Sequence, residues 1–267
     1  FESLLFDGHP LGHRILGNRR SLRTLKAAQI AAFVRRYYTN EHTVFFFMGG
    51  LNAARVMRMV ERYFLGIPSP AVTCIRTPPD NTLPNNRLQQ VKRNTRQSHV
   101  LTGGRGYDMY DARRIPLFLL NNLLGGPGMN SRLNVALRER NGLVYQVESN
   151  VTFYTDAGWY AVYFGASPRD RAQAQELVER ELRRLCTERL SDFRLSAARK
   201  QAIGQMSVAT DQRESLFLGL GKSFLHFNRY ESYAEVCRRI EAVTSGQLLE
   251  VANELFAPEQ RLTLIYE

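Results

Sequence analysis

Residues 123–147 read LLGGPGMNSRLNVALRERNGLVYQV, and this stretch decides the fold. A glycine corner at 125–128 ends one apolar helical pattern, and the Asn-Ser pair at 130–131 can cap a second helix. That helix ends by Gly142, and an apolar strand pattern begins at Leu143. The stretch therefore predicts a helix, a flexible corner, a second helix and a strand in direct succession.

Two side chains in this stretch are candidates for binding a substrate. Arg138 lies in the last turn of the second predicted helix, and Tyr145 follows seven residues later in the strand. Because side chains alternate along a strand, we expect Leu143, Tyr145 and Val147 to share one sheet face. A guanidinium beside a phenol could clamp a peptide carbonyl or stabilise an oxyanion that develops on it. The spacing alone fits better a structural arginine at a helix C-terminus with a packed tyrosine beside it.

The pattern of helices and strands extends on both sides of this stretch. Both faces of the predicted strand at 159–166 are apolar, which favours a sheet covered by helices over a half-exposed one. The other predicted elements are a strand at 99–103, a helix at 112–124, a strand at 143–151, a helix at 168–190, further helices to about residue 255 with breaks near 211, 228 and 244, and a strand at 261–266. The sequence therefore predicts an α+β unit.

The N-terminal part of the chain alternates loops with amphipathic segments. Residues 1–18 are loop-like, and a helical stripe of apolar residues runs from Ser21 to Tyr37. Thr43–Met48 is an apolar, β-prone run, and a further amphipathic helix is expected at Ala53–Phe64. This part therefore predicts a helix, a strand and a second helix.

A proline-rich stretch separates the two parts of the chain. Five prolines lie between residues 66 and 88, and the apolar residues there show neither helical nor strand-like spacing. We therefore expect a truncated first unit at 1–67, a linker at 68–90 and a second unit at 91–267.

An internal similarity connects the two predicted units. Placing each residue against the one 218 positions later aligns Gln29 with Gln247 and Glu41 with Glu259. In both places a helix ends in a short turn and enters an apolar strand. We expect a partial copy of one fold ahead of a complete copy; a chance match between two helix–turn–strand segments is the alternative.

The composition is that of an ordinary globular protein with a basic surplus. Hydrophobic residues make up 44% and charged residues 23%, which excludes a disordered or fibrous chain. The formal net charge is +11, and all but four of the 36 basic residues are arginine. These arginines are spread along the chain and form no basic run of five or six residues. Nucleic-acid binding is therefore only a remote alternative.

Motifs for metal binding and for nucleophilic catalysis are absent from the sequence. Five histidines occur without HExxH or HxxEH, and Pro10 and Gly12 disfavour a helix that would join His9 to His13. The three cysteines form no CxxC, and no serine lies in a GxSxG elbow. The glycine clusters at 103–106 and 125–128 match no nucleotide-binding motif, so we expect tight turns or close backbone approaches there. No stretch is long and apolar enough to span a membrane.

The order of these segments resembles that of the insulinase/pitrilysin-like zinc peptidases, the family that includes the mitochondrial processing peptidases. LLGGPGMNSRL, ALRERNGLVYQV and TDAGWYAVYFGAS follow one another as in the family's non-catalytic half-domain. Upstream, HPLGHRILGNRRSLRTL and YYTNEHTVFFFMGGLNAARVMRMVERYF are similar to the end of the family's first half-domain. Gln97 also lies where the family tends to have a glutamine, so the match covers nearly the whole chain.

The resemblance implies a processing-peptidase-like half-domain of the α+β class, with an antiparallel-rich sheet covered by helices and a partial second copy before it. In this family two half-domains enclose a chamber, and one carries HxxEH and a later glutamate that hold zinc. The other supplies an arginine and a tyrosine for the substrate, which Arg138 and Tyr145 match, with Gly125, Gly126 and Gly128 expected to contact the peptide. Peptides in this family bind by adding a strand to a sheet edge.

The chain departs from the family pattern at the zinc site, because HxxEH is absent. We expect no cofactor in this chain and zinc in a partner half-domain. That half-domain either precedes Phe1 in a longer polypeptide, which a first residue other than Met favours, or belongs to a separate subunit. In both cases the resemblance implies a chain that is inactive by itself and contributes peptide binding to a metalloendopeptidase. The alternative is a catalytically inactive scaffold subunit.

Overall fold

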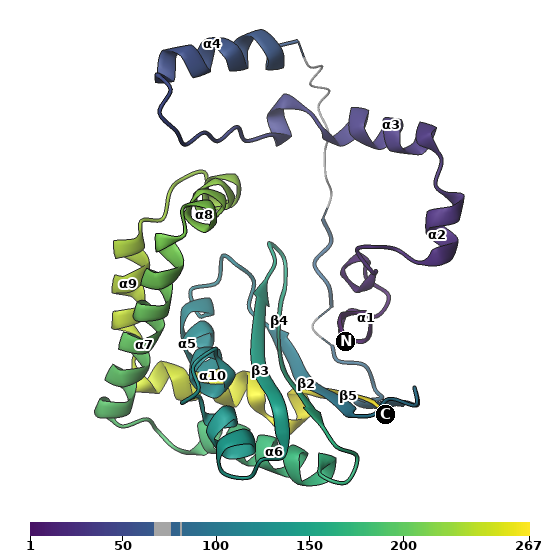
Figure 1. Cartoon of the computed structure of the whole chain (residues 1–267), viewed down its shortest axis with the longest axis vertical. Helices are drawn as coiled ribbons and strands as arrows, with labels where there is room; N and C mark the ends of the chain where they lie inside the picture. The colour runs from purple at the N-terminus through teal and green to yellow at the C-terminus, as the bar shows by residue number, and fades with distance from the viewer. Residues whose placement is uncertain (67–75, 81) are drawn as a thin grey trace. The chain divides into compact units, whose positions relative to one another are not determined.

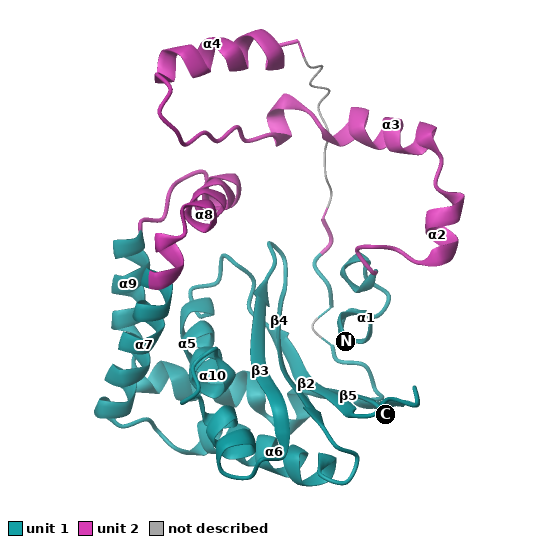
Figure 2. Ribbon diagram, in the orientation of Figure 1, with its two compact units in different colours: residues 1–13, 78–207, 233–267 teal, residues 14–77, 208–232 magenta. Residues whose placement is uncertain are grey.

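The computed structural model describes residues 1–66, 76–80 and 82–267, which fold into two compact units (Figure 2). Unit 1 comprises Phe1–His13, Pro78–Ser207 and Tyr233–Glu267, and unit 2 comprises Arg14–Thr77 and Val208–Ser232. Part of the predicted linker at 68–90, namely residues 68–75 and 81, lies outside the described residues. The predicted boundaries of the two domains stay a prediction.

Unit 1 is built on one five-stranded sheet (Figure 1). Its strand order is β1-β5-β2-β4-β3, in which β1 runs parallel to β5 and every other neighbouring pair is antiparallel. This confirms the predicted antiparallel-rich sheet. The strands are β1 (Leu88–Val91), β2 (Ser98–Gly106), β3 (Val144–Phe153), β4 (Gly158–Ala166) and β5 (Leu262–Tyr266).

The short strand β1 is the strand of this sheet that the sequence did not predict. It lies at the edge of the sheet, and Leu88 is 57% exposed. An edge strand with Gln89 and Gln90 at its centre shows no apolar alternation, so nothing in the sequence separates it from a linker.

Helices α5 and α10 pack on one face of the sheet, and α6 packs on α10 (Figure 1). On β4, the Tyr160 hydroxyl donates to the carbonyl of Leu255, and the Tyr160 ring lies 4.8 Å from the ring of Phe256. The helices of this unit are α5 (Arg114–Gly125), α6 (Arg171–Thr187), α7 (Asp192–Asp211, whose last turn belongs to unit 2), α9 (Tyr233–Ala242) and α10 (Ser245–Phe256). The α+β class and the helix cover are confirmed.

The predicted helix breaks are confirmed as well, and each has a local cause. Helix α7 ends at Asp211, and Asn228 takes a left-handed conformation with φ of 51° after α8 (Arg213–Phe227). Thr244 caps α10 by a reciprocal pair of hydrogen bonds: its hydroxyl accepts from the Gln247 N–H, and the Gln247 side chain accepts from the Thr244 N–H.

The N-terminal residues join unit 1 through a small second core. The stretch that the sequence describes as loop contains α1 (Glu2–Leu5) and a 3-10 turn, η1 (Pro10–Gly12). Leu5 and Phe6 are buried and contact Leu262, with Tyr154 and Trp159 around them. These are long-range contacts, which a loop-like sequence pattern does not indicate.

Unit 2 consists of helices and extended segments without a sheet in its described residues. Its elements are α2 (Arg19–Thr24), α3 (Ala27–Tyr37), η2 (Asn40–His42), α4 (Ala53–Phe64) and α8. The helix predicted at Ala53–Phe64 is confirmed with the same bounds, and the Asn52 side chain caps it through the N–H of Ala54. The strand predicted at Thr43–Met48 is wrong: the segment pairs with no strand among the residues described.

An ion pair joins the start of β5 to α6. Two nitrogens of Arg261 donate to the two carboxylate oxygens of Glu179 at 2.6 and 2.7 Å. The Arg261 side chain is only 6% exposed, whereas that of Glu179 is 43% exposed. Burial alone would lower the pKa of Arg261, but the hydrogen-bonded carboxylate outweighs it and raises that pKa above its ordinary value.

Because Arg261 is buried and Glu179 is partly exposed, we predict that substituting one residue costs more unfolding free energy than substituting the other. Glu179→Ala leaves a buried guanidinium without its carboxylate, so we expect a loss of about 3 kcal/mol of unfolding free energy. Arg261→Met leaves a carboxylate that water can reach, so we expect a loss of about 1 kcal/mol. Urea unfolding of both variants measures the two losses. A larger loss for Arg261→Met would contradict this account of the pair.

Candidate functional site

A pocket of about 640 Å³ lies in unit 1 beside the first half of β3. Three segments line it: the glycine corner after α5, the turn of helix before β3, and β3 itself. The lining residues are Gly125, Gly126, Pro127, Met129, Asn134, Arg138, Glu139 and residues 145–150. The stretch that decides the fold therefore folds back on itself to form one pocket.

The helix predicted between residues 130 and 142 contains a π-helix, η3 (Asn134–Glu139). Its wide turn is visible in the bond from the Arg140 N–H to the Val135 carbonyl, five residues back. Gly142, with φ of 58°, ends the element and directs the chain into β3. Single π-turns of this kind are frequent at functional sites.

A β-bulge at Tyr145 changes which side chains of β3 point toward the core, compared with the alternation expected from the sequence. The register of β3 against β4 shifts between Val144 and Gln146, so Tyr145 is the extra residue. Val144 and Val147 are both buried at 5% exposure, while Tyr145 is 88% exposed. The prediction that Tyr145 and Val147 share one face is therefore wrong, because a bulge reverses the alternation.

Arg138 and Tyr145 line the same pocket, and the described residues show no hydrogen bond between them. The Arg138 guanidinium donates through Nε and Nη2 to one oxygen of Glu139, at 3.0 and 2.9 Å. Its side chain is 32% exposed and that of Glu139 is 48% exposed. Such an exposed pair of neighbours contributes little stability, so the guanidinium can leave the Glu139 carboxylate for another acceptor at a small free-energy cost.

The glycines of the corner lie where other atoms come close. A Cβ on Gly125 would lie 2.7 Å from the Ser149 nitrogen, and one on Gly126 would lie 2.6 Å from the Asn122 carbonyl oxygen. These distances confirm the expected close backbone approach at residues 125–126. Gly128 is outside the pocket lining, and a Cβ there would meet the side chain of Gln201 at 2.6 Å.

The pocket has a buried polar support that the sequence reasoning missed. The Asn121 side chain donates to the Ser149 carbonyl at 2.8 Å and accepts from the Ser149 hydroxyl at 2.6 Å. Both residues are at least nine-tenths buried, so this pair holds α5 against β3 behind the pocket. The available signal was Asn121-Asn122 within the apolar pattern LFLLNNLLG, where a polar pair needs partners.

Strand β3 is the last strand of the sheet, with β4 on one side and no strand on the other among the described residues. A strand in this position can accept an additional extended chain along its free side. The exposed Tyr145 and the half-exposed Arg138 lie at the start of this strand and beside it.

Two further properties bear on what the site can hold. Among the residues that the structure describes, no three His, Cys, Asp or Glu side chains gather in a way that could bind a metal ion. None of the described helices is both long enough and apolar enough to cross a membrane.

The sequence is similar to those of bacterial zinc proteases. It is 28% identical over 270 residues to a protein of Streptomyces coelicolor named an uncharacterized zinc protease, and 26% identical over 261 residues to the uncharacterized zinc protease YmxG of Bacillus subtilis. These matches cover 99% and 97% of the chain. The chain spans 59% and 62% of the length of these two relatives.

The fold matches solved structures at lower sequence identity. The crystal structure of a peptidase M16 inactive domain from Pseudomonas fluorescens superposes with a TM-score of 0.89 at 18% identity, covering 99% of this chain and 63% of that chain. A chain of Complex III2 from Candida albicans gives a TM-score of 0.86 at 14% identity, covering 99% and 64%. At these identities the likeness concerns the fold alone.

The family model described as "Peptidase M16 inactive domain" matches residues 24–202, about two thirds of the chain. Together with the zinc-protease relatives, this confirms the resemblance to the insulinase/pitrilysin-like peptidases. The chain therefore belongs to the M16 peptidase family and carries the inactive domain of that family.

Proposed function

We propose that this chain is the substrate-binding, zinc-free half of a metalloendopeptidase, that it acts in a closed chamber with an HxxEH-bearing half-domain, and that it hydrolyses no peptide by itself. The observation that carries the proposal is the single pocket at the free side of β3 that holds both Arg138 and Tyr145. Five histidines outside any HxxEH offer no zinc donor set in this chain. Zinc belongs to the other half, where it would activate water.

The residues of this chain would hold the substrate in the following way. An extended peptide lies along the free side of β3 as an added strand, and its main-chain groups supply affinity. The Arg138 guanidinium exchanges the Glu139 carboxylate for the carbonyl oxygen of the scissile peptide bond. The exposed Tyr145 hydroxyl donates to the same oxygen as negative charge develops on it.

The glycine corner forms one wall of the pocket. Gly125 and Gly126 line the pocket, and because a Cβ at either would meet Ser149 or Asn122, only glycine lets the corner take this path beside the bound peptide. Gly128 does not line the pocket, so it contributes to peptide binding only by shaping the backbone of the glycine corner.

A second candidate function is that of a scaffold subunit without a peptidase role. The similarity of fold to a chain of Complex III2 from Candida albicans favours it. In that case the pocket beside β3 would bind no peptide, and Arg138 would stay paired with Glu139.

The test is a peptidase assay on the separate and combined halves. An internally quenched, unstructured peptide is mixed with zinc and with this chain, with an HxxEH-bearing half-domain of the same organism, or with both. We expect hydrolysis only from the combination, because neither half contains both the zinc-bound water and the Arg138/Tyr145 pair.

Three results of this assay are decisive. Hydrolysis by this chain alone would contradict the proposal. So would a combination in which the HxxEH-bearing half is equally active without this chain. A stable but inactive complex that binds no peptide would support the scaffold function instead.

A further inference from the structure

Another pocket of unit 1 is lined by residues of η3, α6 and the first turns of α7, and we call it the arginine pocket. Its volume is about 350 Å³, and it shares no lining residue with the pocket beside β3. Its charged lining includes Arg132, Arg184 and Arg194, with Glu181 and Glu188 among them. The lining therefore carries more positive than negative charge.

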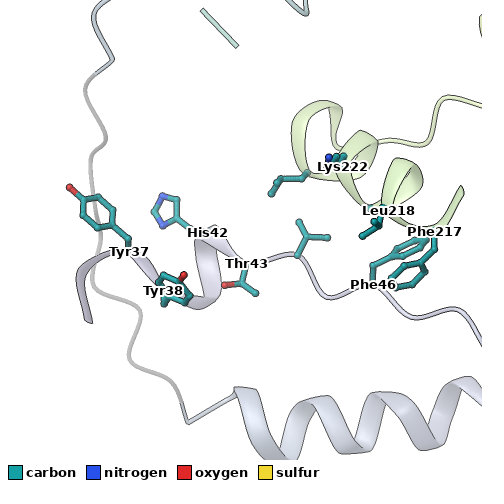
Figure 3. Close-up of a pocket in the computed structure, with 11 residues that line it drawn as sticks. Tyr37, Tyr38, His42, Thr43, Phe46, Phe217, Leu218 and Lys222 are labelled. Carbon is teal, nitrogen blue, oxygen red and sulfur yellow. The ribbon is translucent and has the colours of Figure 1, made fainter. Parts of the chain in front are cut away.

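This charge distinguishes the arginine pocket from the pocket of unit 2. That pocket, of about 540 Å³, is lined by residues of η2, the segment after it and α8 (Figure 3). Side chains such as Phe46, Phe217 and Leu218 make its lining largely apolar, and Lys222 is the one lysine or arginine among the described residues there. The arginine pocket is thus suited to an anion rather than to an apolar ligand.

Arg132 is the least satisfied charged group of the arginine pocket. Its side chain is only 15% exposed, and the nearer carboxylate oxygen of Glu181 is 3.9 Å from its Nη1, which is too far for a hydrogen bond. No described residue accepts a hydrogen bond from Arg132. Burial lowers the pKa of Arg132, and Glu181 opposes this only in part. A guanidinium with five N–H donors therefore lines the pocket without an acceptor.

The buried Arg261 shows how this fold satisfies an arginine when the protein supplies the partner. Arg261 donates two hydrogen bonds to the two oxygens of Glu179, at 2.6 and 2.7 Å. Glu181 does not do the same for Arg132, because one of its oxygens accepts from Arg184 at 3.0 Å and the other stays 3.9 Å from Arg132. Two guanidinium groups thus share one carboxylate, and Arg132 is left with unused donors.

Further positive charge is directed at the same place. Arg194 and Arg184 both add to the lowering of the pKa of Arg132, because like charges close to a guanidinium disfavour its charged form. Arg194 lies in the first turn of α7, a helix of 20 residues, so the positive end of that helix dipole also lies at the pocket. An anion bound there would relieve this repulsion.

The chemistry of the lining favours a phosphate group over other anions. The forked guanidinium donates two parallel hydrogen bonds to phosphate oxygens, and a phosphate dianion balances more than one arginine. Phe193 lines the same pocket and is 84% exposed, so its ring offers a face on which a nucleobase can stack. A volume of about 350 Å³ is at the lower end for ligand pockets and suits a small phosphate compound.

We propose that the arginine pocket binds a phosphate group through Arg132, Arg184 and Arg194. The phosphate is either inorganic phosphate or that of a nucleoside monophosphate whose base stacks on Phe193. This site is separate from the peptide pocket beside β3, and the proposal does not depend on the proposed function.

Isothermal titration calorimetry of this chain with inorganic phosphate and with AMP, at constant ionic strength, tests the proposal. We expect one saturable site per chain. Arg132→Lys keeps the charge but loses the fork, so we expect it to weaken binding by about tenfold or more. Arg194→Glu should weaken binding at least as much. Because a glutamate is favourable in the first turn of a helix, this variant should fold normally, which circular dichroism checks.

Phe193→Ala distinguishes the two sources of the phosphate group. If the ligand is a nucleotide, AMP binds more tightly than inorganic phosphate to the unaltered chain, and Phe193→Ala weakens AMP alone, by about fivefold or more. If the ligand is free phosphate, both compounds bind alike and Phe193→Ala changes neither affinity. Each of these results supports a phosphate site.

Arg183→Glu is the matched control for charge. Arg183 is exposed in α6 and next to Arg184 in sequence, but it does not line the arginine pocket. The substitution changes the net charge as much as Arg194→Glu does, and we expect unchanged binding. Equal weakening by Arg183→Glu and Arg194→Glu would overturn the proposal, because binding would then follow the net charge. Unchanged binding in both Arg132→Lys and Arg194→Glu, or no saturable binding by the unaltered chain at millimolar phosphate, would overturn it as well.

Discussion

Replacing Arg138 with alanine is expected to lower kcat/KM of the zinc-loaded, combined peptidase by about 100-fold or more. The guanidinium is the one cation among the described residues that line the pocket, and its present partner is the exposed carboxylate of Glu139. Loss of a donor that acts on a developing oxyanion costs transition-state stabilisation, so kcat falls more than KM rises. Arg138→Lys keeps the charge but loses the forked geometry, and we expect it to recover only part of the activity.

The same measurement on Tyr145→Phe isolates the hydroxyl group. Tyr145 is 88% exposed, so removal of its oxygen changes no packing and leaves the unfolding free energy within about 0.5 kcal/mol of the unaltered chain. We expect a drop in kcat/KM of similar size to that of Arg138→Ala. The double variant should lose little more than the larger single loss, because the two groups act on one oxygen.

Arg140→Ala provides the control for charge. Arg140 is exposed and close to Arg138 in sequence, but it is outside the lining of the pocket beside β3. A general electrostatic effect of the basic chain would lower the activity of both variants equally. Unchanged kcat/KM for Arg138→Ala in an active complex would contradict the proposed substrate clamp. Arg138 and Tyr145 would then have a structural role only.

The sequence predicted best those features that depend on neighbouring residues. Helix α4 has its predicted bounds because the Asn52 cap and its apolar stripe are both local. The end of α8 at Asn228 and the start of α10 at Thr244 have equally local causes. The sheet covered by helices followed from the strand patterns, and its antiparallel-rich pairing followed from the resemblance to the peptidase family.

Features that depend on distant partners were predicted poorly. The bulge at Tyr145 is defined by the register against β4, which no alternation in one strand reveals. Strand β1 exists because β5 pairs with it from the far end of the chain. Residues 43–48 show the opposite case, since their strand propensity stays unused where no strand of the described part of the chain lies beside them. The site residues come together because three local segments of one short stretch fold back on each other.

The second large effect concerns the glycine cluster at 103–106, which lies within the central strand β2. Gly103 pairs with Ala161 of β4 on one side and with Leu262 of β5 on the other. A Cβ at Gly103 would lie 2.0 Å from the Tyr160 carbonyl oxygen and 2.6 Å from the Ala161 Cα. Both are backbone atoms of a paired strand, so no side-chain rotation can relieve the overlap.

Gly103→Ala is therefore expected to cost about 4 kcal/mol or more, because β2 and β4 must separate where both are held by further pairing. A loss of this size is a large part of the about 5–15 kcal/mol that stabilises an ordinary domain, so the variant should unfold at a clearly lower urea concentration than the unaltered chain. Circular dichroism and urea unfolding measure the effect. Gly204→Ala is the control: this exposed glycine lies in α7, and a new Cβ there would meet no described atom within 4 Å beyond the backbone of its own helix and its chain neighbours. Alanine at this position should stabilise the fold by about 0.5–1 kcal/mol. If the two variants were equally stable, the close approach of β4 to Gly103 would be wrong. In that case neither a turn nor the packing of β4 against β2 would require a glycine at position 103.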